Sequence, residues 1–348
     1  MMYIHQSSCI SPQHSFGQAD LQTLATSVQN KLHVIEPSYP KIPPGMLRRM
    51  GKAVRIGVGA ALALLTEGNA WDGVMIGTAN GGMEDCIKFL NQIVEYEEGL
   101  LAPGNFVQST ANAIASQVGL LTANKKYNAT HVHRGLAFEN ALLDAAMFLA
   151  ENPSKNYLVG GVDEISSFNY NIDFLAGFFR KTPLSNTDLF STMEEGTLAG
   201  EGAIMFNISG RQSGASASIQ AVKMIQSEDP AIGSELCQAI ISDLSKKGTA
   251  IDLLLSGENG DSRLLKYYEA CETLFPPSTT IARFKHMSGE FPTASAFAVW
   301  LATQMITSGS VPDHMLKKEG SKKILKNILI YNNHKSIQHS CILVSSAE

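Results

Sequence analysis

The sequence predicts an α/β protein in which helices cover sheets and two similar halves follow one another. Short apolar segments typical of buried strands alternate with helical segments along the 348 residues. Each half also has strand, turn and helix elements near its centre. This alternation is typical of layered α/β folds. The approximate doubling predicts an internal repeat, with one half at 1–170 and the other at 171–348.

Composition and charge limit the classes of function. Apolar residues make up 44% of the chain and charged residues 17%, which predicts a large dry core, and a net charge of −5 argues against nucleic acid as a partner. Five scattered cysteines without a Cys-x-x-Cys motif fit free thiols in a reducing compartment. Because no run of about 18 apolar residues and no signal peptide is evident, we expect a cytoplasmic protein without a membrane segment.

The elements of the first half follow from apolar spacing. Residues 1–12 are expected to form a strand, and 30–47, with four prolines, an irregular surface segment. Helices are expected at 45–67, 83–95 and 106–121, and a strand at 71–76 that breaks at a glycine-rich turn. Glu84 and Asp85 lie in the first turn of the second helix, where the helix dipole favours acidic residues.

The stretch from Tyr127 to Asp144 organises the rest of the chain. It runs into a helix with an apolar face, and a short buried strand follows at 157–165. A loop that leads into a buried helix is where α/β enzymes usually present a nucleophile, because the free N–H groups there stabilise an anion. This position holds Arg134, Gly135 and Leu136, and neither a cysteine nor a serine.

The second half repeats the alternation. Residues 166–195 are rich in aromatic side chains and are expected to form loops. Strands are expected at 196–207, 251–255, 328–331 and 341–345, and helices after 261 and at 294–305. A loop at 285–293 leads into the last of these helices, which is apolar.

Several segments, taken in order, resemble the β-ketoacyl synthases of fatty-acid and polyketide assembly. The similar segments are GTANGG at 77–82, PGNFVQSTANAIASQVGL at 103–120, the helix and strand at 139–166, GTLAGEGAIMF at 196–206, IDLLLSGENGD at 251–261, FKHMSGEFPTASAFA at 284–298 and ILIYNN at 328–333. Together they cover nearly the whole chain. The resemblance implies a thiolase-like fold, with two similar halves in a layered αβαβα arrangement.

The same resemblance places the reacting positions of that family. Its nucleophilic cysteine falls on Gly135, counted back from the following Gly-Gly turn, and its two histidines fall on Ser256 and Glu290. The lysine of the second histidine loop is kept as Lys285. Condensation needs a thiolate to carry the acyl chain and imidazole N–H groups to stabilise an enolate. A glycine and a carboxylate supply neither, so we expect a chain that is inactive alone.

Within the family, the chain-length-factor subunits of type II polyketide synthases also lack the nucleophile. The resemblance therefore implies a non-catalytic partner of an active ketosynthase, which shapes the tunnel for a chain carried by an acyl carrier protein. THVHRGLAFENALLDA at 130–145 is also similar to synthase-like proteins of aryl-polyene and flexirubin clusters. Two alternatives stay open: an acyl-transferring or condensing enzyme with a relocated nucleophile such as Cys86, and a homodimeric scaffold that binds an acyl carrier or lipid.

Further residues are expected to bind partners. The interface with the ketosynthase is expected to include 103–120 and 134–142. The residues expected in the tunnel or dimer interface are Phe106, Gln108, Phe138 and Phe291. The residues expected to dock the acidic carrier protein are Arg48, Arg49, Lys52 and Arg55. Glu201 is expected to be a buried, paired carboxylate, and His131 with His133 make a poor zinc pattern, so neither a metal nor a cofactor is expected.

Overall fold

A computed structural model describes residues 1–27, 29–66, 70–99, 101, 103–321 and 324–347. Within these residues, one mixed sheet of 11 strands dominates the fold, and β2 (Lys31–Leu32) pairs with β6 (Ala199–Gly200) in a small parallel sheet. In spatial order the strands of the main sheet are β11 (Leu316–Lys318), β10 (Thr280–Arg283), β9 (Leu253–Ser256), β12 (Asn327–His334), β13 (Gln338–Ser346), β8 (Ala217–Gln226), β1 (Met2–Ile10), β7 (Gly202–Ser209), β5 (Asn156–Asp163), β3 (Gly73–Gly77) and β4 (Tyr127–His131).

The strand order contains an internal repeat. The first unit has the spatial order β4-β3-β5-β7-β1 and the second has β10-β9-β12-β13-β8. In both units the strand that comes first in the chain lies at one end, and the strand that comes third lies at the other end. The two units join where Met2–Ile4 pairs with Ala217–Ile219. Because β7 pairs with both β1 and β5, it belongs to the first unit. The boundary that we propose between the halves therefore lies at 210–216 and not at residue 170.

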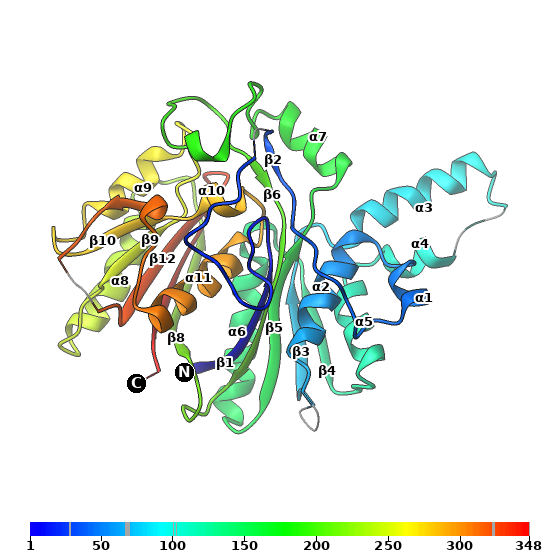
Figure 1. The fold of residues 1–348 in the computed structure, drawn as a ribbon, viewed down its shortest axis with the longest axis horizontal. Helices are drawn as coiled ribbons and strands as arrows, with labels where there is room; N and C mark the ends of the chain where they lie inside the picture. Colours follow the sequence, from blue (N-terminus) through cyan, green and yellow to red (C-terminus); the bar gives the residue numbers. More distant parts are fainter. Residues whose placement is uncertain (28, 67–69, 100, 102, 322–323, 348) are drawn as a thin grey trace.

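Helices and sheet halves form five layers (Figure 1). The central layer is α6 (Ala137–Glu151) and α11 (Ala294–Ser308), which share one apolar core with strands of both units. On the outer faces, α2 (Lys52–Ala63) and α5 (Ala113–Leu121) cover the first unit, and α8 (Ile232–Ser245) and α9 (Leu265–Glu272) cover the second. The predicted layered α/β fold is confirmed.

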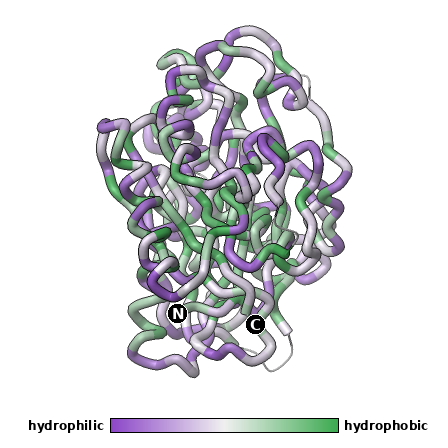
Figure 2. Tube along the Cα trace, turned by 90° about the vertical axis from the view of Figure 1, so that its left-hand side faces the viewer, coloured by the Kyte–Doolittle hydropathy of each residue, from purple (hydrophilic) through white to green (hydrophobic). Residues whose placement is uncertain are grey.

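Side-chain alternation along the strands assigns residues to these layers. Met75 packs in the central core, whereas its neighbours Val74 and Ile76 pack against the outer helices. Burying both faces explains why the strands are apolar throughout. Figure 2 shows hydrophobic residues gathered along the inner segments of the molecule and hydrophilic residues along its periphery. In the described residues, no helix has the length and apolar character needed to cross a membrane.

Two predicted helices are interrupted. The segment 45–67 forms α1 (Pro44–Leu47) and α2, and its last residue lies outside the described residues. The break falls at Gly51, where a Cβ atom would collide with the carboxylate of Asp85. The segment 106–121 forms α4 (Pro103–Gln108) and α5. The side chain of Gln108 accepts a hydrogen bond from the backbone N–H of Gly51, so both breaks meet at one contact.

Other elements differ from or match the prediction. Strand β4 was not expected, because Tyr127–His131 has few apolar side chains. Helix α7 (Ser167–Leu175) lies in a segment expected to form loops, and α10 (Lys285–Ser288) is a short helix in a predicted loop. Helix α3 (Met83–Glu95) has the predicted bounds, and it projects with α4 from the side of the first unit (Figure 1).

Candidate functional site

Gly135 lies at the start of the central helix α6. Strand β4 ends at His131, a 3-10 turn follows at Arg134–Leu136, and α6 begins at Ala137. The backbone of Arg134 is left-handed, with φ of 49°, which is uncommon for a residue with a Cβ atom. Such strain in a sharp strand-to-helix turn is typical of positions that present a nucleophile. The geometry of such a turn is present, but Gly135 has no side chain to present.

His334 fills the space beside Gly135. A Cβ atom on Gly135 would lie 2.5 Å from the Cγ atom of His334 and closer still to its Cβ atom. His334 ends strand β12 and is buried, 6% exposed. The imidazole thus occupies the volume that a side chain at 135 would need. Any nucleophile at this position requires His334 to move.

The backbone N–H of Gly135 is also engaged. It donates a hydrogen bond to Oε1 of Gln338, at 2.9 Å, across the molecule from the first residue of β13. A free N–H at such a helix start would be a donor for an oxyanion. Here the side-chain amide of Gln338 already accepts that hydrogen bond.

A buried ion pair holds Glu290. Nζ of Lys285 lies 2.8 Å from Oε1 of Glu290, and both residues are almost fully buried. Burial alone would raise the pKa of Glu290, but the charge of Lys285 and the nearby His334 hold that pKa at about 2. Glu290 is therefore an anion at neutral pH. An anion here repels an enolate and cannot donate a hydrogen bond to it.

Asn259, and not Ser256, faces Glu290. Nδ2 of Asn259 donates to Oε2 of Glu290 at 3.0 Å, whereas Oγ of Ser256 accepts from the N–H of Glu258. Among the described residues, Ser256, the residue expected at the first histidine position, therefore makes its hydrogen bond within its own loop and not with Glu290. The amide oxygen of Asn259 accepts from the N–H of Asp261, so this side chain links the loop that follows β9 to Glu290.

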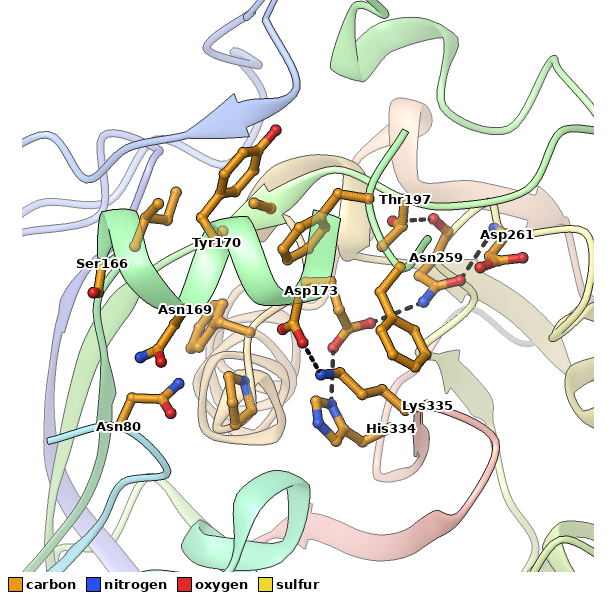
Figure 3. Close-up of a pocket in the computed structure, with 18 of the residues that line it drawn as sticks. Asn80, Ser166, Asn169, Tyr170, Asp173, Thr197, Asn259, Asp261, His334 and Lys335 are labelled. Carbon is orange, nitrogen blue, oxygen red and sulfur yellow. Dashed lines mark hydrogen bonds and ion pairs between the residues drawn. The ribbon is translucent and has the colours of Figure 1, made fainter. Parts of the chain in front are cut away.

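A narrow pocket lies over these residues (Figure 3). Helix α7 covers one side and contributes Tyr170 and Asp173 to the lining, with Asp173 directed toward Lys335. Lys335 closes another side: its Nζ lies 2.5 Å from Oδ1 of Asp173 and 4.4 Å from the ring centre of Phe178. The remaining polar and aromatic lining residues include Asn80, Glu164, Asn169, Phe179, Asn259, Glu290, Phe291 and His334.

The pocket is lined by Glu164, a carboxyl group with a raised pKa. Burial first of all, and then the neighbouring carboxylates of Asp85 and Glu201, raise its pKa to about 7. Glu201 is the buried, paired carboxylate that the sequence predicts, since it accepts hydrogen bonds from Lys52, His33 and two backbone N–H groups. The wall beside α7 therefore carries a carboxyl group that is partly protonated near neutral pH.

The four residues expected in the tunnel or the dimer interface do not come together in one pocket. Only Phe291 lines the pocket. Phe138 is a core residue, 5.8 Å from the ring of Phe206. Phe106 is 59% exposed on the projecting α3–α4 pair, and Gln108 is buried by its contacts with the backbone around Gly51. In the part of the chain that the structure describes, the four side chains therefore do not line one common cavity.

The four basic residues divide into two pairs. Lys52 forms an ion pair with the buried Glu201, and Arg55 forms a two-pronged pair with Glu36, at 2.7 Å for both nitrogen atoms. Arg48 and Arg49 are exposed. Only this second pair has side chains free to meet a partner, whereas the first pair supports the fold.

Sequence reasoning missed three residues of this site: His334, Lys335 and Gln338. All three lie in or beside the turn between β12 and β13. The signal for His334 and Lys335 was the polar run Asn332 to Lys335 at the end of the apolar strand β12, whereas Gln338 lies beyond this run. A run of hydrogen-bonding side chains at the end of a buried strand is where α/β folds place ligand sites.

Comparison by sequence identifies one domain family. The family model described as the N-terminal domain of β-ketoacyl synthase matches residues 23–173. No curated protein matches the chain.

Comparison by structure extends over the full length. A β-ketoacyl synthase from Burkholderia phymatum STM815 is 13% identical, with a TM-score of 0.77 over 99% of each chain. A ketosynthase in complex with its type II polyketide synthase acyl-carrier protein, bound to the hexaketide, gives 14% identity and a TM-score of 0.74, over 100% of this chain and 99% of the other.

A third structure contains a ketosynthase (ApeO) in complex with its chain length factor (ApeC) from Xenorhabdus doucetiae. Its matching chain is 12% identical, with a TM-score of 0.73 over 99% of this chain and 98% of that one. Residues 23–173 thus match the β-ketoacyl synthase N-terminal domain and the whole chain has the thiolase-like ketosynthase fold, which confirms the predicted resemblance to the β-ketoacyl synthase family.

Proposed function

We propose that this chain is a non-catalytic, chain-length-factor-type subunit that pairs with an active ketosynthase during assembly of a polyketide, polyene or fatty-acid-like chain. One observation carries the proposal. The nucleophile position is a glycine whose missing side chain is replaced in space by His334, beside an ionised Glu290. Such a site holds no thiolate and no enolate-stabilising imidazole pair.

The projecting side of the first unit supplies a surface for the partner. Strand β4 is the outermost strand at this end of the sheet in the described chain, and an outermost strand has backbone groups that can pair with another strand. Large apolar side chains are exposed nearby on α4, namely Phe106 and Val107, and on α3, where Val94 is 81% exposed. An apolar surface of this kind favours burial against another protein.

The carrier protein would meet a different face. Arg48 and Arg49 are the exposed pair of the four predicted basic residues. An acidic carrier protein is attracted to such a pair. The ketosynthase–carrier and ketosynthase–chain length factor complexes among the structural relatives support both partners. Membership of an aryl-polyene or flexirubin system is a narrower proposal, based on the 130–145 segment alone.

Native purification from the host, read by mass spectrometry, tests the proposal. We expect a near-stoichiometric ketosynthase with its cysteine and both histidines present. Recovery of the chain as a homodimer carrying an acyl ligand would favour the scaffold alternative. Acylation of Cys86 or of any serine on incubation with acyl-carrier substrates would favour the relocated-nucleophile enzyme.

A further inference from the structure

A polar cleft of about 280 Å³ lies at the opposite end of the main sheet from the pocket beside Gly135. Hydrogen-bonding side chains and one glycine line it, namely His5, Gln6, Asn156, Asn207, Arg211 and Gly214. Strand β5 begins at Asn156, in this cleft, and ends at Asp163, next to Glu164 of the other pocket. The 8 residues of this strand span about 23 Å, so the two sites are separate.

The polar side chains of the cleft follow the apolar outer face of the first unit. On β7, Ala203 and Met205 pack in the core that α2 covers, and Asn207 is the next residue on the same face. Asn207 pairs with Gln6 of β1 on one side and with Leu158 of β5 on the other. Neighbouring strands therefore bring polar side chains together where the outer core ends.

An irregularity in β1 brings His5 to the same cleft. The pairing register of β1 with β7 shifts between Ile4 and Gln6, so His5 is an extra residue in its strand, as in a β-bulge. Nε2 of His5 lies 2.7 Å from Oγ of Ser209, and this oxygen accepts a hydrogen bond from the backbone N–H of Arg211. These contacts hold the start of the loop that carries Arg211 against the sheet.

Asn207 has an unpaired oxygen atom at this place. The residue is only 4% exposed, and its amide oxygen Oδ1 has no hydrogen-bond partner among the described residues. A buried polar atom without a partner is costly, and most such atoms in proteins are paired. Because an amide oxygen accepts hydrogen bonds, a ligand that satisfies Asn207 must bring a hydroxyl or an N–H group.

Arg211 gives the cleft a positive charge. Its side chain is exposed, and none of the ion pairs among the described residues involves it. Burial lowers the pKa of His5, the carbonyl groups of Gly214 and Arg211 act in the opposite direction, and the charge of Arg211 lowers this pKa further. His5 is therefore mainly neutral at pH 7. The described lining residues include neither an aspartate nor a glutamate, so the charge of Arg211 is not balanced within the cleft.

We propose that this cleft binds a small hydroxy acid, an organic carboxylate that also carries a hydroxyl group. The planar guanidinium of Arg211 suits a carboxylate, which accepts two parallel hydrogen bonds from it, and the two single charges balance. The hydroxyl group of the ligand donates to Oδ1 of Asn207. A phosphate ester, with close to two negative charges at pH 7, would leave one charge unbalanced. The site does not depend on the proposed pairing with a ketosynthase.

Saturation-transfer NMR on the full chain, in the oligomeric state in which it is isolated, tests the site at pH 7. The probes are glycerate, propionate and glycerol, which carry a carboxylate with hydroxyl groups, a carboxylate alone and hydroxyl groups alone. We expect glycerate to bind about threefold more tightly than propionate or better, and glycerol to show no saturable binding. Absence of saturable binding by glycerate, or equal affinities for glycerate and propionate, would overturn the proposal.

Variants assign the two contacts. Arg211→Gln removes the charge at an exposed position and is expected to weaken the binding of both acids about tenfold or more. Asn207→Leu keeps a side chain of similar volume but removes the acceptor, so glycerate and propionate are expected to bind equally well. Lys247→Gln, exposed beyond the end of α8, is the matched control and is expected to leave both affinities unchanged.

Each variant can also contradict the assignment. Glycerate binding that is unchanged in Arg211→Gln would show that the carboxylate lies elsewhere, and this exposed position decides the question even if Asn207→Leu does not fold. A preference for glycerate that persists in Asn207→Leu would exclude Asn207 as the acceptor of the hydroxyl group.

Discussion

His334 and Gly135 share one space, although they lie on opposite halves of the chain. The imidazole Cγ atom lies 2.5 Å from the point where a Cβ atom on Gly135 would be. The glycine therefore does more than remove a nucleophile, because its small size lets β12 extend its last side chain over the start of α6. A side chain at 135 and the imidazole of His334 in its present position therefore exclude each other.

Gly135→Cys is expected to destabilise the chain and to give no condensing activity. The new side chain collides with His334, and overpacking of this kind costs about 1–3 kcal/mol. The free energy of unfolding, measured with urea, checks the first part. An assay with malonyl- and acyl-carrier substrates checks the second, because the ionised Glu290 remains unsuited to an enolate.

The double variant Gly135→Cys with His334→Gly is the control for the collision. Removing the imidazole makes room for the thiol. Adding Gly135→Cys to the His334→Gly variant is therefore expected to lower the free energy of unfolding much less than adding it to the parent chain. A Gly135→Cys chain as stable as the parent would show that His334 moves freely. Product formation by the single variant would contradict the argument from the lost histidines.

Lys285 and Glu290 are expected to depend on each other. Lys285→Met leaves a buried carboxylate without its partner at 2.8 Å, which costs about 3–5 kcal/mol. Adding Glu290→Gln removes the uncompensated charge, so the double variant is expected to be more stable than Lys285→Met alone. Urea unfolding of both single variants, the double variant and the parent gives the coupling energy. Additive effects of the two substitutions would show that the pair contributes no coupling.

The fold was more predictable from sequence than the site. The bounds of α3 follow from apolar spacing and from two acidic residues in its first turn, Glu84 and Asp85, both of which are local signals. Strand β4 has polar residues at most positions, and its place in the sheet is set by pairing with β3. Helix α7 was missed because its side chains contact neighbours that are distant in sequence: Lys31 lies over the ring of Tyr170, and Lys335 pairs with Asp173.

The site depends on contacts between the two halves. Gly135 was located by counting back from the pair Gly160-Gly161, which was expected to form a turn and lies within strand β5; this count is a local relationship. The position of His334 beside it, the hydrogen bond from Gly135 to Gln338, and the contact of Asn259 with Glu290 all join separate loops. Spacing in the sequence does not encode such contacts. They follow only when α6 and α11 pack together between the sheet halves.

His286 is expected to make the chain less stable in acid. Burial lowers its pKa from 6.5 to about 3, and the charges of His314 and Arg283 contribute. Because the unfolded chain binds the proton first, stability is lost as the pH falls from 6.5 toward 3, by about 2–3 kcal/mol at pH 4.5. Unfolding by urea between pH 7 and 4.5 measures this loss.

The hydrogen bonds of His314 determine which nitrogen of His286 carries the hydrogen. Nε2 of His314 lies 2.9 Å from the carbonyl oxygen of Leu21, which can only accept, so this nitrogen carries the hydrogen. Nδ1 of a neutral His314 then accepts from Nε2 of His286, at 2.9 Å. His286→Gln is expected to reduce the slope with pH, whereas His14→Gln at an exposed position leaves it unchanged. Identical slopes in parent and His286→Gln would contradict this account.

The projecting helices are expected to hold the ketosynthase partner. Val107→Glu replaces a 55% exposed apolar side chain on α4 with a charge, which would be buried without a partner in the complex. Co-purification of the ketosynthase from the host is expected to fall at least tenfold, while the free energy of unfolding of the isolated chain stays within about 0.5 kcal/mol. Leu175→Glu is the matched control, because Leu175 is 83% exposed on α7, away from the α3–α4 pair. Retention of the partner by Val107→Glu together with its loss in Leu175→Glu would move the interface from the edge at β4 to the face beside the pocket.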